Sequence, residues 1–410
     1  MNYKFNNIET SRMISLTKFF PLLLAGVIFS PHLKNHASDQ DNGLKEEVVD
    51  FNKKSSTEGE LPQPSGELLS ISHAPKSLGD GIPVGSLGID GGKKELIVKL
   101  VDEMSQDPKK KFDSLLIAYK GKLISESYFR KGRIDHPHIV MSISKSLTAM
   151  ALGRAMQLGY ISMADLDKPV LDFLTKVDKT KVVDGAEQVT LAEVLNLHSG
   201  IKLDKNKMKK AGKKLKGQKM VEAMFSASQP IVKEKQQWQY GGIDPTITMT
   251  VVDTVAPSSA QEFISKEFFG KMGISNYKWP KDKNNLPRAA AGVEMTSRDM
   301  LKIGLMMMAN GKWDGEQLIP EEYMKKAMSP IWPGKHNGAY GFFIWNKDVE
   351  IGGKRSGGKK VSCISCRGAA GQFILIYPEM DLVVVSSAKI KGGGPMLDLA
   401  PERILPAFNQ

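Results

Sequence analysis

Cysteine is scarce in this 410-residue chain, which contains only Cys363 and Cys366. Two cysteines cannot build the disulfide framework that holds a small secreted domain together. Their Cys-x-x-Cys spacing does not indicate a redox motif, because no helix of the thioredoxin type follows it. A bridge between them would need a turn, since residues i and i+3 of a strand point to opposite faces. The sequence therefore predicts two thiols near a sheet and leaves a disulfide open.

Long apolar runs and metal-binding clusters are also missing. No run of 18 apolar residues occurs, so no transmembrane helix is predicted. The chain has no His-Glu-x-x-His cluster, and we expect no metal and no other cofactor. Acidic residues are fewer than basic ones, 45 against 57. The resulting net charge of +12 favours anionic partners such as lipid headgroups or cell-wall polymers. Nucleic acid is not predicted as a partner, because no nucleic-acid-binding motif is present.

The N-terminus has the pattern of an export signal. Three basic residues precede the apolar stretch 19–29, which is too short to span a bilayer comfortably. We predict a signal peptide at residues 1–37, cleaved after Ser30 or Ala37, and hence a periplasmic or secreted protein of the bacterial envelope. An N-terminal membrane anchor is the alternative. No cysteine follows the apolar stretch, so a lipoprotein is not expected.

Regular patterns fill the chain after residue 92. Hydrophobic residues make up 41% of the sequence, enough for one large or two moderate cores. Residues 38–92 read as a linker and an irregular N-terminal segment, and residues 93–410 as the folded domain. The expected elements are a helix at 93–106, strands at 115–119 and 123–129, helices from 142 to about 275, strands at 373–377 and 382–385, and a helix at 397–408. This order predicts an α+β fold: an antiparallel sheet flanked by helices, with an inserted, mostly helical lobe at about 140–284.

The motif with the most chemical content is Ser142-Ile143-Ser144-Lys145. Ser142 opens the apolar helical segment 146–156, so it would share a helix face with Lys145. A partly desolvated lysine can help to remove a serine proton, and the free N–H groups of a helix N-terminus can stabilise an oxyanion. The alternative is a serine-rich helix start with a solvated lysine. Context is needed to choose, because Ser-x-x-Lys begins at six positions, Ser15, Ser142, Ser199, Ser275, Ser356 and Ser386.

Other motifs follow in a fixed order. They are the block 189–201, the stretch 238–244 around Tyr240, the segment 290–300 and the stretch 367–374 before the last strand pair. With this order the chain resembles the serine β-lactamase and penicillin-binding-protein superfamily over roughly residues 110–408. It is most similar to class C β-lactamase-like hydrolases, which include serine esterases, D-amino-acid peptidases and 6-aminohexanoate-dimer hydrolases.

The resemblance implies roles for individual residues. Ser142 would be the nucleophile, and Tyr240, assisted by Lys145, the general base. A phenol titrates near pH ~10, so Tyr240 needs nearby cations such as Lys145 to lower its pKa. Gly242 stands where the family has the asparagine of Tyr-x-Asn, at the edge of the substrate site. His198 would be structural. In segment 290–300, Thr296 or Ser297 is expected to cap a helix.

The third family motif, Lys-Thr-Gly or His-x-Gly, aligns with three small residues that would let substrate lie along the strand edge, namely Ala369, Ala370 and Gly371. The backbone N–H of Gln372 would then complete the oxyanion hole with that of Ser142. Arg367 could replace the missing lysine. A literal His-x-Gly at 336–338 is interpreted as a loop.

The resemblance therefore implies an exported serine hydrolase that forms an acyl-enzyme on Ser142 and acts on a small ester, amide or peptide. Loss of the asparagine and the lysine favours an ester or linear amide over a β-lactam. D-Alanyl carboxypeptidase or β-lactamase-type activity is one alternative, and a penicillin-binding-like sensor without turnover is another. The chain has no Gly-x-Ser-x-Gly, which argues against an α/β-hydrolase.

One segment does not follow the family pattern. Residues 202–219 contain nine lysines, at 202, 205, 207, 209, 210, 213, 214, 216 and 219. An electropositive lid for acidic substrates, or a surface that docks on an anionic envelope, is one hypothesis. A solvated helix or disordered loop is the alternative.

Overall fold

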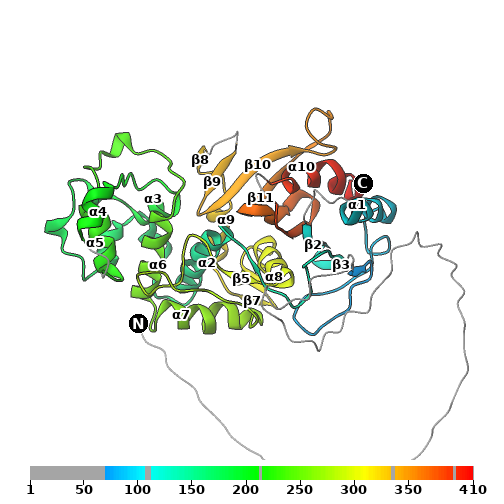
Figure 1. Ribbon diagram of the computed structural model, residues 1–410, viewed down its shortest axis with the longest axis horizontal. Coiled ribbons are helices and arrows are strands. Elements are labelled where there is room, and N and C mark those ends of the chain that lie inside the picture. Colours follow the sequence, from blue (N-terminus) through cyan, green and yellow to red (C-terminus); the bar gives the residue numbers. More distant parts are fainter. Residues whose placement is uncertain (1–69, 107–111, 212–214, 334–337, 391–393, 410) are drawn as a thin grey trace, which may run out of the picture. The chain divides into compact units, whose positions relative to one another are not determined.

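A computed structural model describes residues 70–106, 112–211, 215–333, 338–390 and 394–409 (Figure 1). The predicted signal peptide at 1–37 and the first part of segment 38–92 lie outside these residues and stay predictions. The same holds for His336 and Asn337 of the predicted loop. No helix in the described part of the chain is both long and apolar enough to span a bilayer.

A nine-stranded antiparallel sheet forms the centre of the domain, in the order β1-β3-β2-β13-β12-β11-β10-β9-β8. Its two halves come from opposite ends of the sequence and meet at β13, where Val384 pairs with Ile117 of β2 and with Leu375 of β12. The predicted sheet is thus confirmed. Its strands are β1 (Ser70–Ser72), β2 (Phe112–Tyr119), β3 (Lys122–Tyr128), β8 (Trp332–Pro333), β9 (Ala339–Gly341), β10 (Ile344–Glu350), β11 (Lys360–Gly368), β12 (Gln372–Tyr377) and β13 (Leu382–Ala388).

Each face of the sheet packs against its own hydrophobic cluster. One cluster joins the sheet to α1 (Lys94–Gln106), α10 (Met396–Leu399) and α11 (Leu405–Phe408). The other joins it to α2 (Ile143–Gln157), α8 (Ser297–Met308) and α9 (Glu321–Ala327). Strand alternation sends Cys363 to the first cluster and Cys366 to the second. Both are buried free thiols.

Helices between β3 and β8 build the lobe beside the sheet (Figure 1). It contains α3 (Leu191–Leu195), α4 (Lys205–Ala211), α5 (Gln218–Ser226), α6 (Ile243–Val255) and α7 (Ala260–Phe263). Helix α6 packs against α2, so the lobe and the sheet share α2 as a common wall.

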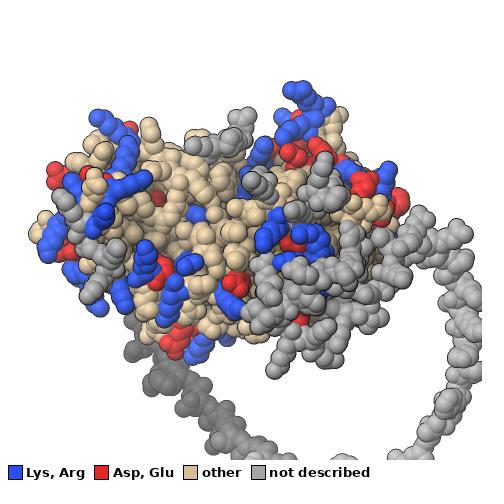
Figure 2. All heavy atoms as spheres, viewed as in Figure 1, with Lys and Arg blue, Asp and Glu red and all other residues tan. Residues whose placement is uncertain are grey.

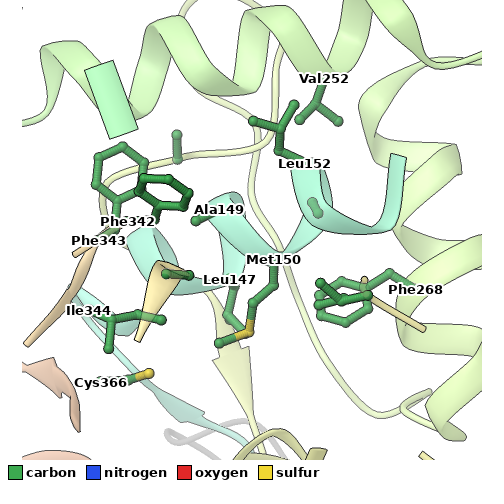
Figure 3. Close-up of a cluster of buried hydrophobic side chains, with 14 of the residues drawn as sticks. Leu147, Ala149, Met150, Leu152, Val252, Phe268, Phe342, Phe343, Ile344 and Cys366 are labelled. Carbon is green, nitrogen blue, oxygen red and sulfur yellow. The ribbon is translucent and has the colours of Figure 1, made fainter. Parts of the chain in front are cut away.

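Helix α2 is buried on every side, from Ile143 to Met156. Figure 3 shows Leu147 and Met150 of this helix among side chains of neighbouring elements, including Phe268 and Phe343. A helix surrounded by core must satisfy its polar groups internally. Accordingly, the Ser146 Oγ donates to the Phe343 carbonyl at 2.6 Å.

Two terminal elements differ in detail from the sequence prediction. The C-terminal helix is not regular, because a π-helical turn at Ala400–Ile404 separates α10 from α11. Pro401 and Pro406 each lack the N–H that a continuous α-helix would use. At the other end, β1 adds a strand to the sheet from within segment 38–92, pairing with β3.

Thr296 is the N-cap of α8 and accepts from the amide of Asp299.

Candidate active site

Ser142 occupies the N-cap of α2, but its hydroxyl makes no capping hydrogen bond. The preceding residue, Met141, has φ 50°, in the left-handed region that side chains other than glycine rarely adopt. Such strain is held by surrounding contacts and often occurs at functional positions. Here Ser144 supplies two of these contacts, since its Oγ donates to the Met141 carbonyl (2.7 Å) and accepts from the Val293 amide (3.2 Å). The chain therefore presents the Ser142 hydroxyl at a helix N-terminus without using it structurally.

Lys145 lies one turn further along α2, and its Nζ is 3.2 Å from the Ser142 Oγ. The same ammonium donates to the carbonyl of Ala290 at 2.7 Å. Lys145 is only 4% exposed, and this burial lowers its pKa to about 8. The alternative of a solvated lysine is therefore wrong, because the side chain is inside the protein and points to the serine. The contact with Ala290 had no sequence signal, since it uses a backbone carbonyl far along the chain.

Tyr240 lies in the loop before α6, with its ring over the same ammonium: the Lys145 Nζ is 4.8 Å from the ring centroid. Although Tyr240 is 42% exposed, partial desolvation by its neighbours raises its pKa above its ordinary value, while a hydrogen bond with Ser142 and the positive charge of Arg367 act in the opposite direction. The expectation that Lys145 lowers this pKa is wrong. The ammonium faces the ring, and desolvation of the phenolate outweighs the other effects.

Gly242 is the N-cap of α6 and lies against Ala290, whose Cβ would be 3.3 Å from a Cβ at position 242. Since Lys145 donates to the Ala290 carbonyl, Ala290 lies between Gly242 and the Lys145 ammonium. In the first turn of α6, Asp244 is buried and accepts from the Ser199 Oγ at 2.6 Å. Burial raises the pKa of Asp244 to about 7.

The end of β11 approaches the nucleophile through Gly368. A Cβ at this position would collide with the Val140 carbonyl and lie 3.2 Å from the Met141 Cβ. Only a glycine permits this approach, and Ala369 follows it in the chain.

The following residues make contacts in another direction. The Ala370 carbonyl accepts from the Ile390 amide at 3.0 Å, and the Gly371 carbonyl accepts from the Ser386 Oγ at 3.1 Å. The Gln372 side chain donates to the Ala388 carbonyl. These contacts tie residues 370–372 to β13 and the segment after it. The glycine that touches the nucleophile loop is therefore Gly368, three positions before the one chosen from the sequence.

An aromatic cluster borders Tyr240 on the side of the sheet. The Trp345 ring centroid is 5.8 Å from that of Tyr240 and 4.9 Å from that of Tyr340. The Arg367 guanidinium carbon lies 4.9 Å from the Trp345 ring centroid, a cation–π distance. Trp345 thus joins Arg367 to Tyr240. Its proximity could not be read from the sequence, because the two aromatic residues are about a hundred positions apart.

His198 does not contribute to this constellation. Its ring stacks on Trp332, with centroids 3.8 Å apart and an interplanar angle of 14°. Burial lowers its pKa, which favours the neutral form. Packing of this kind agrees with the structural role expected for His198. Across the described ranges, no group of three or more His, Cys, Asp and Glu side chains is placed to hold a metal ion.

Comparison with known proteins adds a family. A family model described as Beta-lactamase matches residues 98–407. Among solved structures, the chain is similar to a class C β-lactamase, with 16% identity, a TM-score of 0.61, and coverage of 79% of this chain and 98% of that chain. It is also similar to a D-stereospecific amidohydrolase from Streptomyces sp., with 15% identity, a TM-score of 0.54 and coverage of 75% and 98%. For an octameric penicillin-binding protein homologue from Pyrococcus abyssi the values are 18%, 0.56, 77% and 77%. At these identities the structural likeness concerns the fold.

Proposed function

The chain belongs to the β-lactamase family, and from this premise we propose that it is a serine hydrolase that cleaves an ester or linear amide through an acyl-enzyme on Ser142. The family resemblance predicted from the sequence is confirmed by the match over residues 98–407. The observation that carries the proposal is the buried Lys145 ammonium, 3.2 Å from the Ser142 Oγ and 4.8 Å from the Tyr240 ring centroid.

In the acylation step, the Ser142 Oγ forms a bond to the substrate carbonyl carbon as it loses its proton. The structure favours Lys145 as the first acceptor, because its pKa is lowered to about 8 whereas that of Tyr240 is raised. The leaving oxygen or nitrogen then departs with a proton, which Tyr240 is placed to relay. Water attacks the resulting ester on Ser142 and releases the acid, and the proton returns to the serine.

The oxyanion would be held by backbone amides. The Ser142 N–H at the start of α2 is one donor, since helix N-terminal amides lack internal partners. For the second donor the contacts of Gly368 support the amide of Ala369. The backbone N–H of Gln372, which is the donor predicted from the sequence, is the alternative, and the side chain of Gln372 donates to the Ala388 carbonyl. Ala370 and Gly371 would then line the turn beyond the substrate.

The strand edge beside Ser142 supports a linear substrate. Strand β10 pairs with β11 only as far as Ser365, so Cys366–Gly368 extend past it while pairing with β12. An extended amide could lie along such an edge and use its backbone groups. Gly242 and Ala369 stand at the positions that align with the family's asparagine and lysine, so neither of those side chains is present to hold a β-lactam. D-Peptides remain a second substrate class, because the same edge would accept them.

Export remains part of the proposal. It rests on the basic residues and the apolar stretch at 19–29 in the sequence. A periplasmic or secreted hydrolase would meet small esters, amides or peptides of the envelope. A sensor that acylates without turnover would use the same serine, and only kinetics separates it from an enzyme.

The experiment is turnover of a short-chain p-nitrophenyl ester by the protein and by Ser142→Ala, with fluorophosphonate labelling of both. We expect turnover and labelling that depend on Ser142. Stoichiometric labelling without turnover would favour the sensor. A wild-type protein that neither turns over esters, D-peptides and amides nor accepts the label would overturn the proposal.

A further inference from the structure

The positive charge of the chain is concentrated in one short stretch. Residues 202–235 contain 11 lysines, three acidic residues and no arginine. Their net charge of +8 is two-thirds of the +12 carried by all 410 residues. This stretch plays no part in the chemistry proposed above, and so its charge calls for a separate explanation.

The described lysines of this stretch lie on the surface of the helical lobe. We name six exposed ones the lysine surface: Lys202, Lys205, Lys207, Lys209, Lys216 and Lys219. They lie on or beside α4 and α5, in the part of the lobe away from the sheet (Figure 1). In Figure 2 the blue side chains outnumber the red ones over this lobe.

Little of this charge is neutralised within the protein. Asp204, the acidic residue nearest α4, accepts from the backbone amides of Asn206 (2.8 Å) and Lys207 (3.1 Å), and these bonds lower its pKa. The Asp204 carboxylate therefore caps the first turn of α4. Lys219 pairs with Glu222 at 2.7 Å. For the other five lysines, no ion pair occurs among the interactions of the described residues.

A neighbouring turn lies beside the lysine surface but adds no net charge to it. The Asp178 amide donates to Glu222 Oε2 at 2.7 Å, which fixes the turn containing Lys179 and Lys181 beside α5. Both of these lysines are exposed, and each pairs with an acid of its own loop. The lysines of the lysine surface that have no ion pair repel one another, and an anionic partner would relieve this repulsion when it binds.

We propose that the lysine surface docks the protein on a bilayer of anionic phospholipids. Lysine without arginine suits a diffuse layer of headgroup phosphates, whereas arginine is the residue for bidentate recognition of a defined group. The stretch also contains apolar side chains at the surface: Val232 is 44% exposed, and Met208 and Met220 are half-buried among the lysines. Such side chains can enter the headgroup region.

A nucleic acid fits these features less well. The one aromatic residue between positions 202 and 235, Phe225, is buried, so no ring is available for base stacking. The inference concerns binding and is independent of the proposed hydrolase activity.

The test is cosedimentation of the full chain with vesicles of phosphatidylglycerol and phosphatidylcholine, at low and high salt. The variant replaces Lys202, Lys205, Lys207 and Lys209 with glutamine. A matched control replaces four exposed lysines outside the surface, Lys271, Lys281, Lys283 and Lys326, with glutamine. Circular dichroism verifies that both variants fold. Each lysine near an anionic membrane contributes on the order of 1 kcal/mol, so we expect the surface variant to lose at least about tenfold in partitioning.

The expected result is binding to phosphatidylglycerol that salt weakens, that the control variant keeps and that the surface variant loses. Equal loss of binding in both variants would show that binding depends only on the net charge of the protein, and would overturn the proposal. Binding to phosphatidylcholine that salt does not weaken would point to an apolar anchor and also overturn it. Tighter binding to duplex DNA or polyphosphate than to vesicles would show that the lysine surface binds an anionic polymer, and would also overturn the proposal.

Discussion

At the scale of single residues, Lys145 has an unusual environment for a lysine. Its ammonium contacts a hydroxyl and a carbonyl and has an aromatic ring 4.8 Å away. Within the described part of the chain, it forms no hydrogen bond or ion pair with a carboxylate. Burial without a counter-charge destabilises the protonated form. The neutral amine is thus accessible near neutral pH, which suits proton transfer more than structural pairing.

This environment predicts the pH dependence of activity. If neutral Lys145 accepts the serine proton, kcat/KM should rise with pH and level off above about 8, the value to which burial lowers the lysine pKa. Steady-state kinetics between pH 6 and 10 would measure it. Tyr240→Phe serves as the control: it should reduce kcat, but its kcat/KM should still rise with pH and level off near pH 8. If kcat/KM of this variant no longer rises with pH, Tyr240 is the titrating base.

Asp244 predicts a pH dependence of stability. Its pKa is raised to about 7 in the folded protein, above the ordinary 3.8, so folding favours the protonated carboxyl. Its contribution to stability is full below about pH 4 and is lost as the pH rises toward 7. Asp244→Asn stays neutral and can still accept from Ser199. Relative to wild type, its unfolding free energy should increase by about 1.4 kcal/mol per pH unit over this range.

Urea unfolding at pH 5 and pH 8 measures this difference. Asp204→Asn is the control: backbone amides lower the pKa of Asp204, so its carboxylate is ionised at both pH values and its removal should lower stability equally at pH 5 and pH 8. An Asp244 variant whose relative stability is the same at both pH values would show that the carboxyl titrates normally.

At the scale of elements, two glycines let strands and helices approach closely, for different purposes. Gly368 brings the end of β11 against the loop before Ser142. Gly304 brings α8 against the sheet, where an added Cβ would be 2.6 Å from the Val383 Cγ1 and 2.9 Å from the Ile374 Cγ2. The Gly368 contact therefore affects the geometry around Ser142, and the Gly304 contact affects the packing of the hydrophobic core.

Alanine substitutions should therefore separate activity from stability. Gly368→Ala should lower kcat/KM about a hundredfold with the fold retained, because a small displacement of catalytic groups has an effect of that size. Gly304→Ala should lower the unfolding free energy by about 1–3 kcal/mol through overpacking, with the activity of the folded protein unchanged. Ester turnover and urea denaturation of both variants provide the measurement. Full activity of Gly368→Ala would contradict the placement of the β11 end beside Ser142.

At the scale of the whole domain, one buried cation joins three distant parts of the chain. Arg298 of α8 forms a bidentate pair with Glu126 of β3, at 2.8 and 2.7 Å. It also contacts Asp80 at 3.1 Å and donates to the Lys76 carbonyl at 3.1 Å. The N-terminal segment, the sheet and a helix thus depend on a single guanidinium that is 3% exposed.

Arg298→Met should destabilise the domain by about 3–5 kcal/mol, because it leaves the Glu126 carboxylate buried without its partner. Lys325→Met, which breaks an exposed pair with Glu321, is the matched control and should change stability by less than about 1 kcal/mol. Equilibrium denaturation of both proteins measures the difference. Equal effects would mean that the buried network contributes no more than a surface pair.

Several features were predictable because they depend on neighbours in sequence. The spacing of Ser142 and Lys145 fixes them on one helix face wherever the helix lies. The alternation in β11 sends Cys363 and Cys366 to opposite faces, and Thr296 caps α8 through the amide of Asp299, three residues away. Hydrophobic periodicity likewise predicted the strand pairs on either side of the lobe.

Other features depend on which distant segments meet, and only the tertiary structure decided them. Gly368 ends β11 and Gly371 comes just before β12, and only the contact of Gly368 with Val140 and Met141 shows which of the two lies beside the nucleophile. The Lys145 ammonium lies over the face of the Tyr240 ring. Whether the phenol pKa is raised or lowered could not be predicted from the sequence, because desolvation depends on everything packed around a group. The sequence by itself therefore determined the family, the antiparallel sheet and the serine–lysine pair. The tertiary structure decided which strand end touches the nucleophile and which partners surround it, since long-range packing is a property of the fold and not of any local pattern.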